Sequence, residues 1–93
     1  MNDTLRIQIA NEFRNTVLGF VRIKRNLKIN HLSNAKTEAY LKNTILSTPL
    51  EDIEKNGKNY YFKCFENNAL LTINSYTLTV ITAKQITKNT QGA

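Results

Sequence analysis

The 93-residue sequence is poor in the side chains that build disulfides and metal sites. It contains one cysteine, Cys64, and one histidine, His31. A single cysteine excludes an internal disulfide framework, which fits a reducing cytosol. Zinc sites need three or four nitrogen, sulfur or oxygen ligands at short spacing, and one His with one Cys does not supply them. We therefore expect no bound metal.

Long apolar runs and cofactor-binding motifs are also missing. No stretch approaches the roughly 20 apolar residues that span a bilayer, and the N-terminus lacks the apolar segment of a secretory signal. The phosphate-binding loop, the dinucleotide fingerprint G-x-G-x-x-G and the zinc-protease motif H-E-x-x-H do not occur. These absences predict a cytoplasmic protein with no membrane segment and no cofactor.

Acidic residues are the scarce charged class. Asp and Glu number 7 against 13 Lys and Arg, which gives a formal net charge of +6. This charge is high for a chain of this length and indicates a polyanionic partner, either nucleic acid or an acidic protein. Simple solubility is the alternative explanation, because net charge alone says nothing about chemistry.

The first half of the chain has the apolar periodicity of helices. Residues 3–14 and 16–28 each repeat apolar side chains three or four positions apart, which gives each helix one apolar face. A weaker pattern at about 35–46 ends before Pro49, because proline disfavours helical backbone at the preceding residue. In the second helix the residues expected on the core-facing side are Val17, Phe20, Ile23 and Leu27, with Val21 beside them.

Two residues near the start of the second helix attract attention. Thr16 is a plausible N-cap. Gly19 lies inside the helix, where glycine costs roughly 1 kcal/mol against alanine. A close approach of helix and sheet, or a boundary between the first two helices, would explain why glycine is tolerated there.

The last third of the chain has the composition of strands. Runs rich in Val, Ile, Thr, Tyr and Phe alternate between apolar and polar positions. We place four strands at residues 50–55, 59–65, 69–74 and 76–84. The breaks between them are short, and Asn56-Gly57 is a hairpin signal, so neighbouring strands are expected to pair antiparallel.

These patterns predict an α+β fold in which two to three N-terminal helices pack on one face of a four-stranded antiparallel sheet. Residues 1–93 are expected to form a single domain. Its helical part covers about 3–47, its sheet part about 50–84, and a polar tail follows at 86–93. The apolar sheet face takes the helices and holds Cys64 as a buried small hydrophobe, while the polar face stays open.

The open sheet face and the basic second helix together form the candidate site. Phosphate oxygens are bound by Arg and Lys with hydroxyl or amide donors, and single-stranded RNA also stacks on aromatic rings. The residues predicted to be catalytic are Arg22, Arg25, Tyr61, Thr77, Thr79 and Lys84. The further residues predicted to bind nucleic acid are Lys24, Lys28, Lys63 and Asn74.

Two alternatives stay open for individual residues of this site. The cations at the end of the second helix would also suit the helix dipole as a solvated basic face. His31 could titrate near neutral pH and act as a general base, but a histidine in a polar loop is more often merely exposed. Its role is therefore left unassigned.

Three segments resemble a family of short bacterial proteins catalogued as a domain of unknown function. They are LGFVRIKRNL at 18–27, GKNYY at 57–61 and TINSYTLTVITA at 72–83. The family ending reads like TIN-x-x-SYTIITAH. This chain is two residues shorter before Ser-Tyr-Thr and has Lys84 in place of the histidine. If that histidine is catalytic in the family, then in this chain its role is either lost or taken by Lys84.

The element order also resembles the fold of the barnase, colicin and RelE-type ribonucleases. The resemblance implies a small metal-independent ribonuclease of bacterial toxin type, with RNA as substrate and a protein antitoxin as a possible partner. A 2′-hydroxyl would attack the adjacent phosphate and leave a cyclic phosphate. Arg22 and Arg25 would bind and neutralise that phosphate. The resemblance is one of topology, and fold does not imply function.

A non-catalytic module is the alternative function. It would bind nucleic acid or an acidic protein in a defence or phage system, and the lack of a convincing acid–base pair favours it. A purely structural subunit is the third hypothesis. Convergence of Arg22, Arg25 and residues 77–84 on one concave site would favour the ribonuclease, whereas a flat basic face would favour the binding module.

Overall fold

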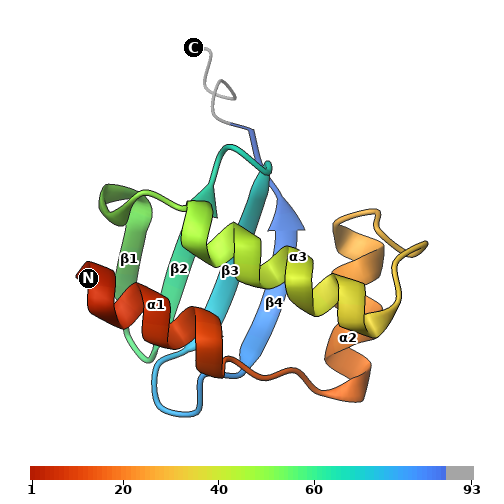
Figure 1. Cartoon of the computed structure of the whole chain (residues 1–93), viewed down its shortest axis with the longest axis horizontal. Helices are drawn as coiled ribbons and strands as arrows, with labels where there is room; N and C mark the ends of the chain where they lie inside the picture. Colours follow the sequence, from red (N-terminus) through yellow and green to blue (C-terminus); the bar gives the residue numbers. More distant parts are fainter. Residues whose placement is uncertain (88–93) are drawn as a thin grey trace.

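The computed structural model describes residues 1–87, in which three helices are followed by a four-stranded sheet (Figure 1). The helices are α1 (Asp3–Glu12), α2 (Val17–Asn26) and α3 (Asn34–Ser47). The strands are β1 (Ile53–Asn56), β2 (Asn59–Cys64), β3 (Ala69–Asn74) and β4 (Val80–Gln85). They lie in the order β1-β2-β3-β4, and every neighbouring pair is antiparallel. The predicted α+β fold is therefore confirmed.

Each helix begins at a side-chain cap. The side chains of Asn2, Thr16 and Ser33 accept hydrogen bonds from the backbone N–H three residues further on. Such caps satisfy N–H groups that have no partner inside the helix. The predicted cap at Thr16 is confirmed. α2 ends at Asn26, before the predicted 28, because Lys28 takes a φ of 60° that a helix cannot continue.

Gly19 is explained by the cap of its own helix. A Cβ atom at this position would lie 2.9 Å from Thr16 Oγ1, the atom that accepts the Gly19 N–H. A side chain here would therefore push the capping hydroxyl away. Of the two predicted causes, a close approach of helix and sheet is wrong, because only Thr16 atoms lie within 4 Å of that Cβ position.

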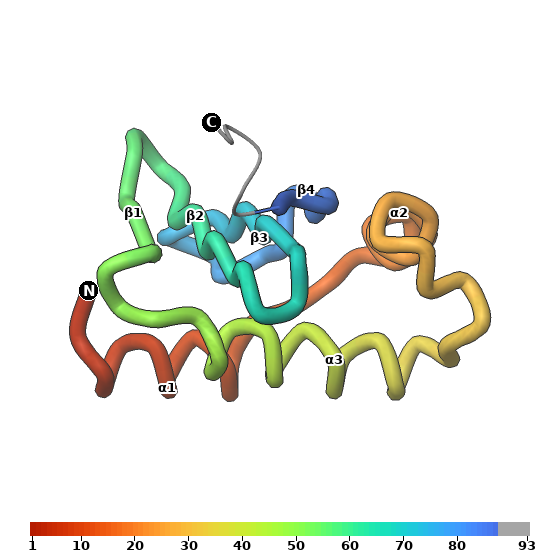
Figure 2. The backbone as a smooth tube through the Cα atoms, turned by 90° about the horizontal axis from the view of Figure 1, so that it is seen from above, coloured from red at the N-terminus to blue at the C-terminus, as the bar shows by residue number. Residues whose placement is uncertain are grey.

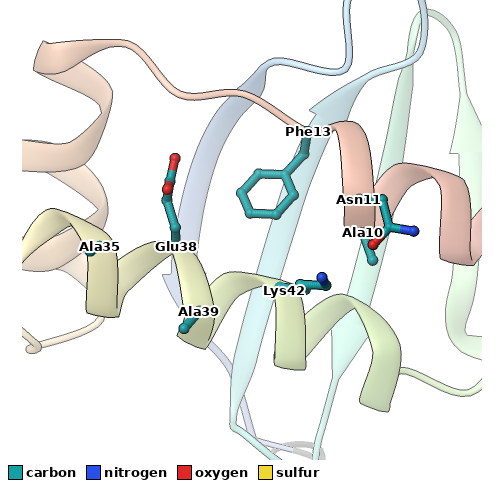
Figure 3. A pocket seen from close by; sticks show the side chains of 7 residues that line it. All are labelled: Ala10, Asn11, Phe13, Ala35, Glu38, Ala39 and Lys42. Atoms are coloured by element: carbon teal, nitrogen blue, oxygen red, sulfur yellow. The ribbon is translucent and has the colours of Figure 1, made fainter.

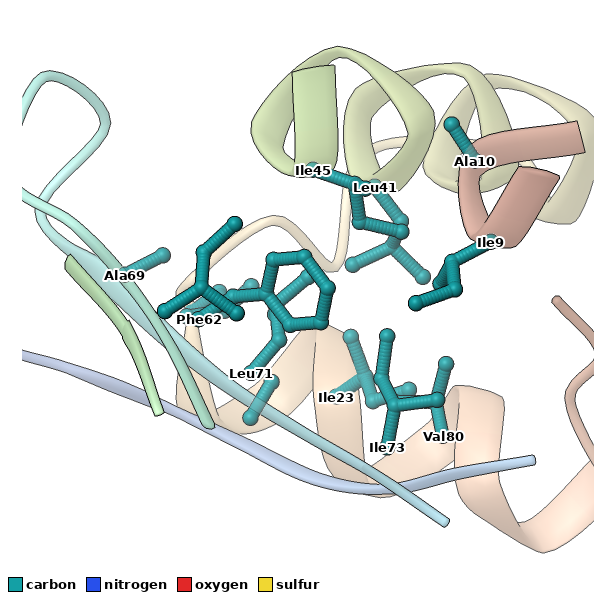
Figure 4. Close-up of a cluster of buried hydrophobic side chains, with 13 residues drawn as sticks. Ile9, Ala10, Ile23, Leu41, Ile45, Phe62, Ala69, Leu71, Ile73 and Val80 are labelled. Atoms are coloured by element: carbon teal, nitrogen blue, oxygen red, sulfur yellow. The ribbon is translucent and has the colours of Figure 1, made fainter. Parts of the chain in front are cut away.

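Two helices form a layer on one face of the sheet, and the third flanks one edge of the sheet. Seen from above, α1 and α3 lie under one sheet face, and α2 lies beside β4 (Figure 2). The core fills the space between the sheet and the helices, where its side chains interdigitate (Figure 4). The fully buried core residues from both layers include Ile9, Leu41, Ile45, Phe62, Leu71 and Ile73. Cys64 is also fully buried on this face, as predicted.

The free edge of β4 is covered by α2 and by the linker that precedes it. Asn26 Nδ2 donates to the carbonyl oxygen of Ala83 at 3.0 Å. In the linker, the Arg14 N–H donates to Leu78 O at 3.0 Å, and the Val80 N–H donates to Arg14 O at 2.9 Å. These bonds occupy edge groups that would otherwise be open to pairing with another strand.

The position of α2 corrects one prediction about its faces. Ile23 and Leu27 are buried as expected, but Val17 is 81% exposed and Val21, predicted beside them, is 53% exposed. A helix that crosses a sheet face can bury residues along its whole length. α2 flanks the edge instead, so its first turn has no layer to pack against.

Several strand boundaries also differ from the prediction. Leu50–Asp52 is a 3-10 turn, so β1 begins at Ile53. The β1–β2 loop consists of residues 57 and 58, since Asn56, which was predicted to lie in the turn, pairs with Asn59. Gly57 supplies the positive φ of 63° that this turn requires. At the C-terminus, the Ile86 N–H donates to Asn68 O, so ordered pairing reaches the first residue of the predicted tail, and 88–93 lie outside the described residues.

The largest difference lies at the start of β4, which was predicted at residue 76 and begins at Val80. Asn74 Oδ1 accepts the backbone N–H groups of Tyr76 at 2.8 Å and Thr77 at 2.9 Å, and this turn replaces strand pairing. Leu78 has a φ of 59°. The register then shifts between Thr72 and Ile73, which is the signature of a β-bulge.

Candidate nucleic-acid interface

The N-terminal basic segment is built around α2. Residues 13–37 contain 6 of the 13 Lys and Arg residues and no Asp or Glu. Arg22 and Arg25 are exposed on α2, while Ile23 is buried against the core. Because a helix has 3.6 residues per turn, Arg22 lies one turn before Asn26, on the flank that meets β4. Arg25 projects from the side of α2 opposite Ile23, into solvent.

The outer face of the sheet continues this basic surface. The bulge after Val80 turns Ala83 inward, where it is fully buried, and leaves Thr82 and Lys84 exposed. Lys84 pairs with Leu70, which pairs in turn with Lys63 on β2. Two lysines thus lie in one row across the outer face. Without the bulge, strict alternation from Val80 would have pointed Lys84 toward the core.

Tyr61 and Lys63 lie on the same outer face, two strands away from β4. At a strand spacing of about 4.8 Å, this places them on the order of 10 Å from the Lys84 strand. Tyr61 is half-buried. Lys63 Nζ lies 2.9 Å from Glu54 Oε2, and both side chains are well exposed. Exposed ion pairs of this kind contribute at most about 1 kcal/mol, so a phosphate can compete for Lys63.

The structure therefore brings Arg22 and Lys84 to the junction of α2 and β4, with Arg25 on the solvent side of the same helix. It sets Tyr61 and Lys63 further along the same surface. We call this set of five residues the basic face. Sequence reasoning missed Thr82, the exposed hydroxyl two residues before Lys84, because only the bulge reveals which way it points.

Three other predicted site residues have structural partners in the β3–β4 turn. Asn74 Oδ1 accepts from two backbone N–H groups, as described above. Thr77 Oγ1 lies 2.9 Å from Thr79 Oγ1 and also contacts Asn74 Oδ1 at 3.3 Å. These hydrogen bonds explain the residue types at 74, 77 and 79 without a ligand.

The two remaining predicted lysines lie at the C-terminal end of α2. Lys24 Nζ donates to the carbonyl oxygen of Leu32 at 3.2 Å and so ties the loop after α2 to the helix. Lys28 is exposed in its left-handed conformation. His31 is exposed in the loop that follows. Among the described residues, no hydrogen bond or salt bridge joins any of these three side chains to the basic face.

The structural role of the turn gives a testable expectation. Asn74→Ala removes the acceptor of two backbone N–H groups, and we expect the free energy of unfolding to fall by about 1–2 kcal/mol. Urea denaturation followed by circular dichroism measures this. RNA affinity of the folded variant is expected to stay within about twofold of the parent. A large loss of affinity at unchanged stability would instead make Asn74 a ligand-binding residue.

Tyr40 has a shifted pKa, but it lies on the helical side of the sheet. Burial raises the pKa of Tyr40 above its ordinary value, nearby Cys64 adds to this, and a hydrogen bond with Thr44 opposes it. Its hydroxyl donates to the Asn67 carbonyl at 3.4 Å. Since Tyr40 belongs to α3, this shift reflects packing between helix and sheet rather than the basic face.

A pocket of about 360 Å³ also lies away from the basic face. It opens between α1 and α3, with the Phe13 ring beside Glu38 and Lys42 (Figure 3). None of the predicted site residues lines it. Within residues 1–87 there is no cluster of three or more His, Cys, Asp or Glu side chains that could hold a metal ion, and no helix long and apolar enough to cross a membrane.

Together these features define a small α+β protein. The chain belongs to the family described as "Protein of unknown function (DUF3781)", which it matches over residues 7–84. The resemblance to a family of unknown function, seen in the segments at 18–27, 57–61 and 72–83, is thereby confirmed. Comparison with curated proteins and with solved structures finds no significant match.

Proposed function

We propose that this protein binds single-stranded RNA across its basic face, as a small bacterial cytoplasmic protein of a toxin or defence system. The observation that carries the proposal is that exposed Arg22 and Arg25 run alongside the strand that displays Lys84. Arginine and lysine side chains along one surface suit a phosphate backbone, and an aromatic ring on the same surface can stack a base. Tyr61 is the ring available for this.

Binding is favoured over cleavage by what surrounds the phosphate-binding groups. General acid–base catalysis needs a proton donor and acceptor within hydrogen-bonding reach of the reacting atoms. Thr77 and Thr79 hydrogen-bond to each other within a turn. The pocket of about 360 Å³ is lined by α1 and α3 residues instead. These observations support a basic surface that holds RNA without cutting it.

Metal-independent cleavage is the second candidate, in the manner of the ribonuclease fold that the element order resembles. One observation favours it: Lys84 is exposed on the strand beside the α2 arginines. The 2′-oxygen of the substrate would bond to phosphorus as its proton passes to a base. The bond to the 5′-oxygen would break, and that oxygen would take up a proton, leaving a 2′,3′-cyclic phosphate.

One experiment separates these candidates. The purified protein is incubated with an end-labelled unstructured RNA and with tRNA in EDTA, and each mixture is run on native and denaturing gels. We expect a mobility shift without cleavage, which weakens steeply as salt rises because bound phosphates release counterions. Discrete fragments ending in cyclic phosphate would establish the ribonuclease. Intact RNA with no shift would remove RNA as the partner.

A further inference from the structure

α2 exposes an aliphatic stripe that no part of the described chain covers. Val17 is 81% exposed, Leu18 68% and Val21 53%. They occupy adjacent positions on the solvent side of the helix, opposite the buried Ile23. Single exposed apolar residues are ordinary, but three neighbours on one helix face form a continuous apolar surface. We call these three residues the α2 stripe.

Positive charge surrounds the stripe. Arg14 precedes the helix, while Arg22 and Arg25 follow the stripe by one turn, and all three are exposed. Residues 13–37 hold no acidic side chain that could neutralise them. Within residues 1–87 the two salt bridges, Arg6–Asp3 and Lys63–Glu54, do not involve these arginines. The surface is thus apolar along its centre and cationic at both ends.

An apolar stripe with arginines at both ends favours one kind of binding partner over the others that an apolar helix face can have. RNA would be attracted by the arginines, but its phosphate backbone would not cover the aliphatic side chains. A second copy of this chain, packed α2 against α2, would bring arginines together in a dimer of doubled positive charge, which is unfavourable. An amphipathic helix with acidic flanks satisfies both features at once, since its apolar face covers the stripe and its carboxylates pair with the arginines.

We propose that the α2 stripe is a docking site for an acidic amphipathic helix of a partner protein. The inference does not rest on RNA binding. If the protein binds both RNA and the partner helix, the two ligands compete, because both contact Arg22 and Arg25. The partner would then also regulate RNA access to the basic face.

The test uses two synthetic helical peptides as probes. Both carry the same leucine stripe at helical spacing, and they differ only in having Glu or Lys at the flanking positions. Fluorescence anisotropy with the full chain is expected to show binding of the Glu peptide and at least tenfold weaker binding of the Lys peptide. Leu18→Ser/Val21→Ser is expected to weaken binding of the Glu peptide at least tenfold.

A matched control separates the stripe from general apolar contact. Ile7→Ser/Leu46→Ser removes two other exposed aliphatic side chains. Ile7 on α1 is 44% exposed and Leu46 on α3 is 40% exposed. This control is expected to bind the Glu peptide like the parent. Equal binding of both peptides, equal loss in both variants, or no binding would overturn the proposal. Two other results would also overturn it. They are self-association of the parent chain, or its binding to anionic lipid vesicles, if the Leu18→Ser/Val21→Ser variant specifically loses that property.

Discussion

Phe62→Ala is expected to lower the free energy of unfolding by about 3–5 kcal/mol, the usual cost of removing a buried aromatic side chain. Phe62 is fully buried in the middle of β2, and its cross-strand neighbours Ile53 and Leu71 are also buried. The ring fills space between the sheet and α3 that alanine leaves empty (Figure 4). Native domains are stable by only about 5–15 kcal/mol. The variant should therefore be close to unfolding at room temperature.

Urea denaturation followed by circular dichroism measures this loss, and another aromatic residue of the sheet region provides the control. Tyr76 is 77% exposed in the β3–β4 turn. Tyr76→Ala should change the free energy of unfolding by no more than about 0.5 kcal/mol, as is usual for surface substitutions. If Phe62→Ala costs less than about 1 kcal/mol, the packing of the helical layer on this sheet face is wrong.

Local signals explain why so much of the fold could be predicted. Alternation in β2 and β3 assigns each side chain to a face through its own position, so the burial of Phe62, Cys64 and Leu71 follows directly. The Thr16 cap and the Pro49 boundary are likewise decided within a few residues of chain. Such features depend on backbone geometry and on hydrogen bonds between residues close in the sequence, so they can be predicted from a few neighbouring residues.

The errors arise where distant segments decide the structure. Helical periodicity shows that α2 has an apolar side, but it does not show how far that side is covered. Because α2 flanks β4, Ile23 is covered and Val17 is not. The bulge in β4 depends on its pairing with β3, so alternation alone misplaces everything after Val80. That bulge decides whether Lys84 belongs to the candidate site.

The residue types of the candidate site could therefore be predicted, but their arrangement in space could be predicted only in part. A basic helix and a polar sheet face could be read from the residues themselves. The sequence could not show that Asn74, Thr77 and Thr79 satisfy one another in a turn, because this requires knowing that the strand starts four residues later than its β-rich composition indicates. Residues suited to binding phosphate are equally suited to capping backbone groups.

Arg22→Glu/Arg25→Glu is expected to weaken binding of single-stranded RNA on the order of 100-fold at low salt. Each lost phosphate contact should also lower the slope of log affinity against log salt by about 0.7, hence by about 1.4 for both arginines. Filter binding over a range of salt concentrations measures the affinity and the slope together. Both residues are exposed, so circular dichroism is expected to show the parent's secondary structure.

A charge-matched control distinguishes a defined interface from general attraction. Lys42→Glu/Lys58→Glu changes the net charge by the same amount. Lys42 is exposed on α3, in the layer across the sheet from the basic face (Figure 2), and Lys58 is exposed in the β1–β2 loop. Net charge acts over a Debye length of about 10 Å at 0.1 M salt, so this variant should lose affinity mainly at low salt and keep its slope. If both variants lose affinity and slope equally, RNA is held by net charge rather than by the surface that α2 and β4 form together.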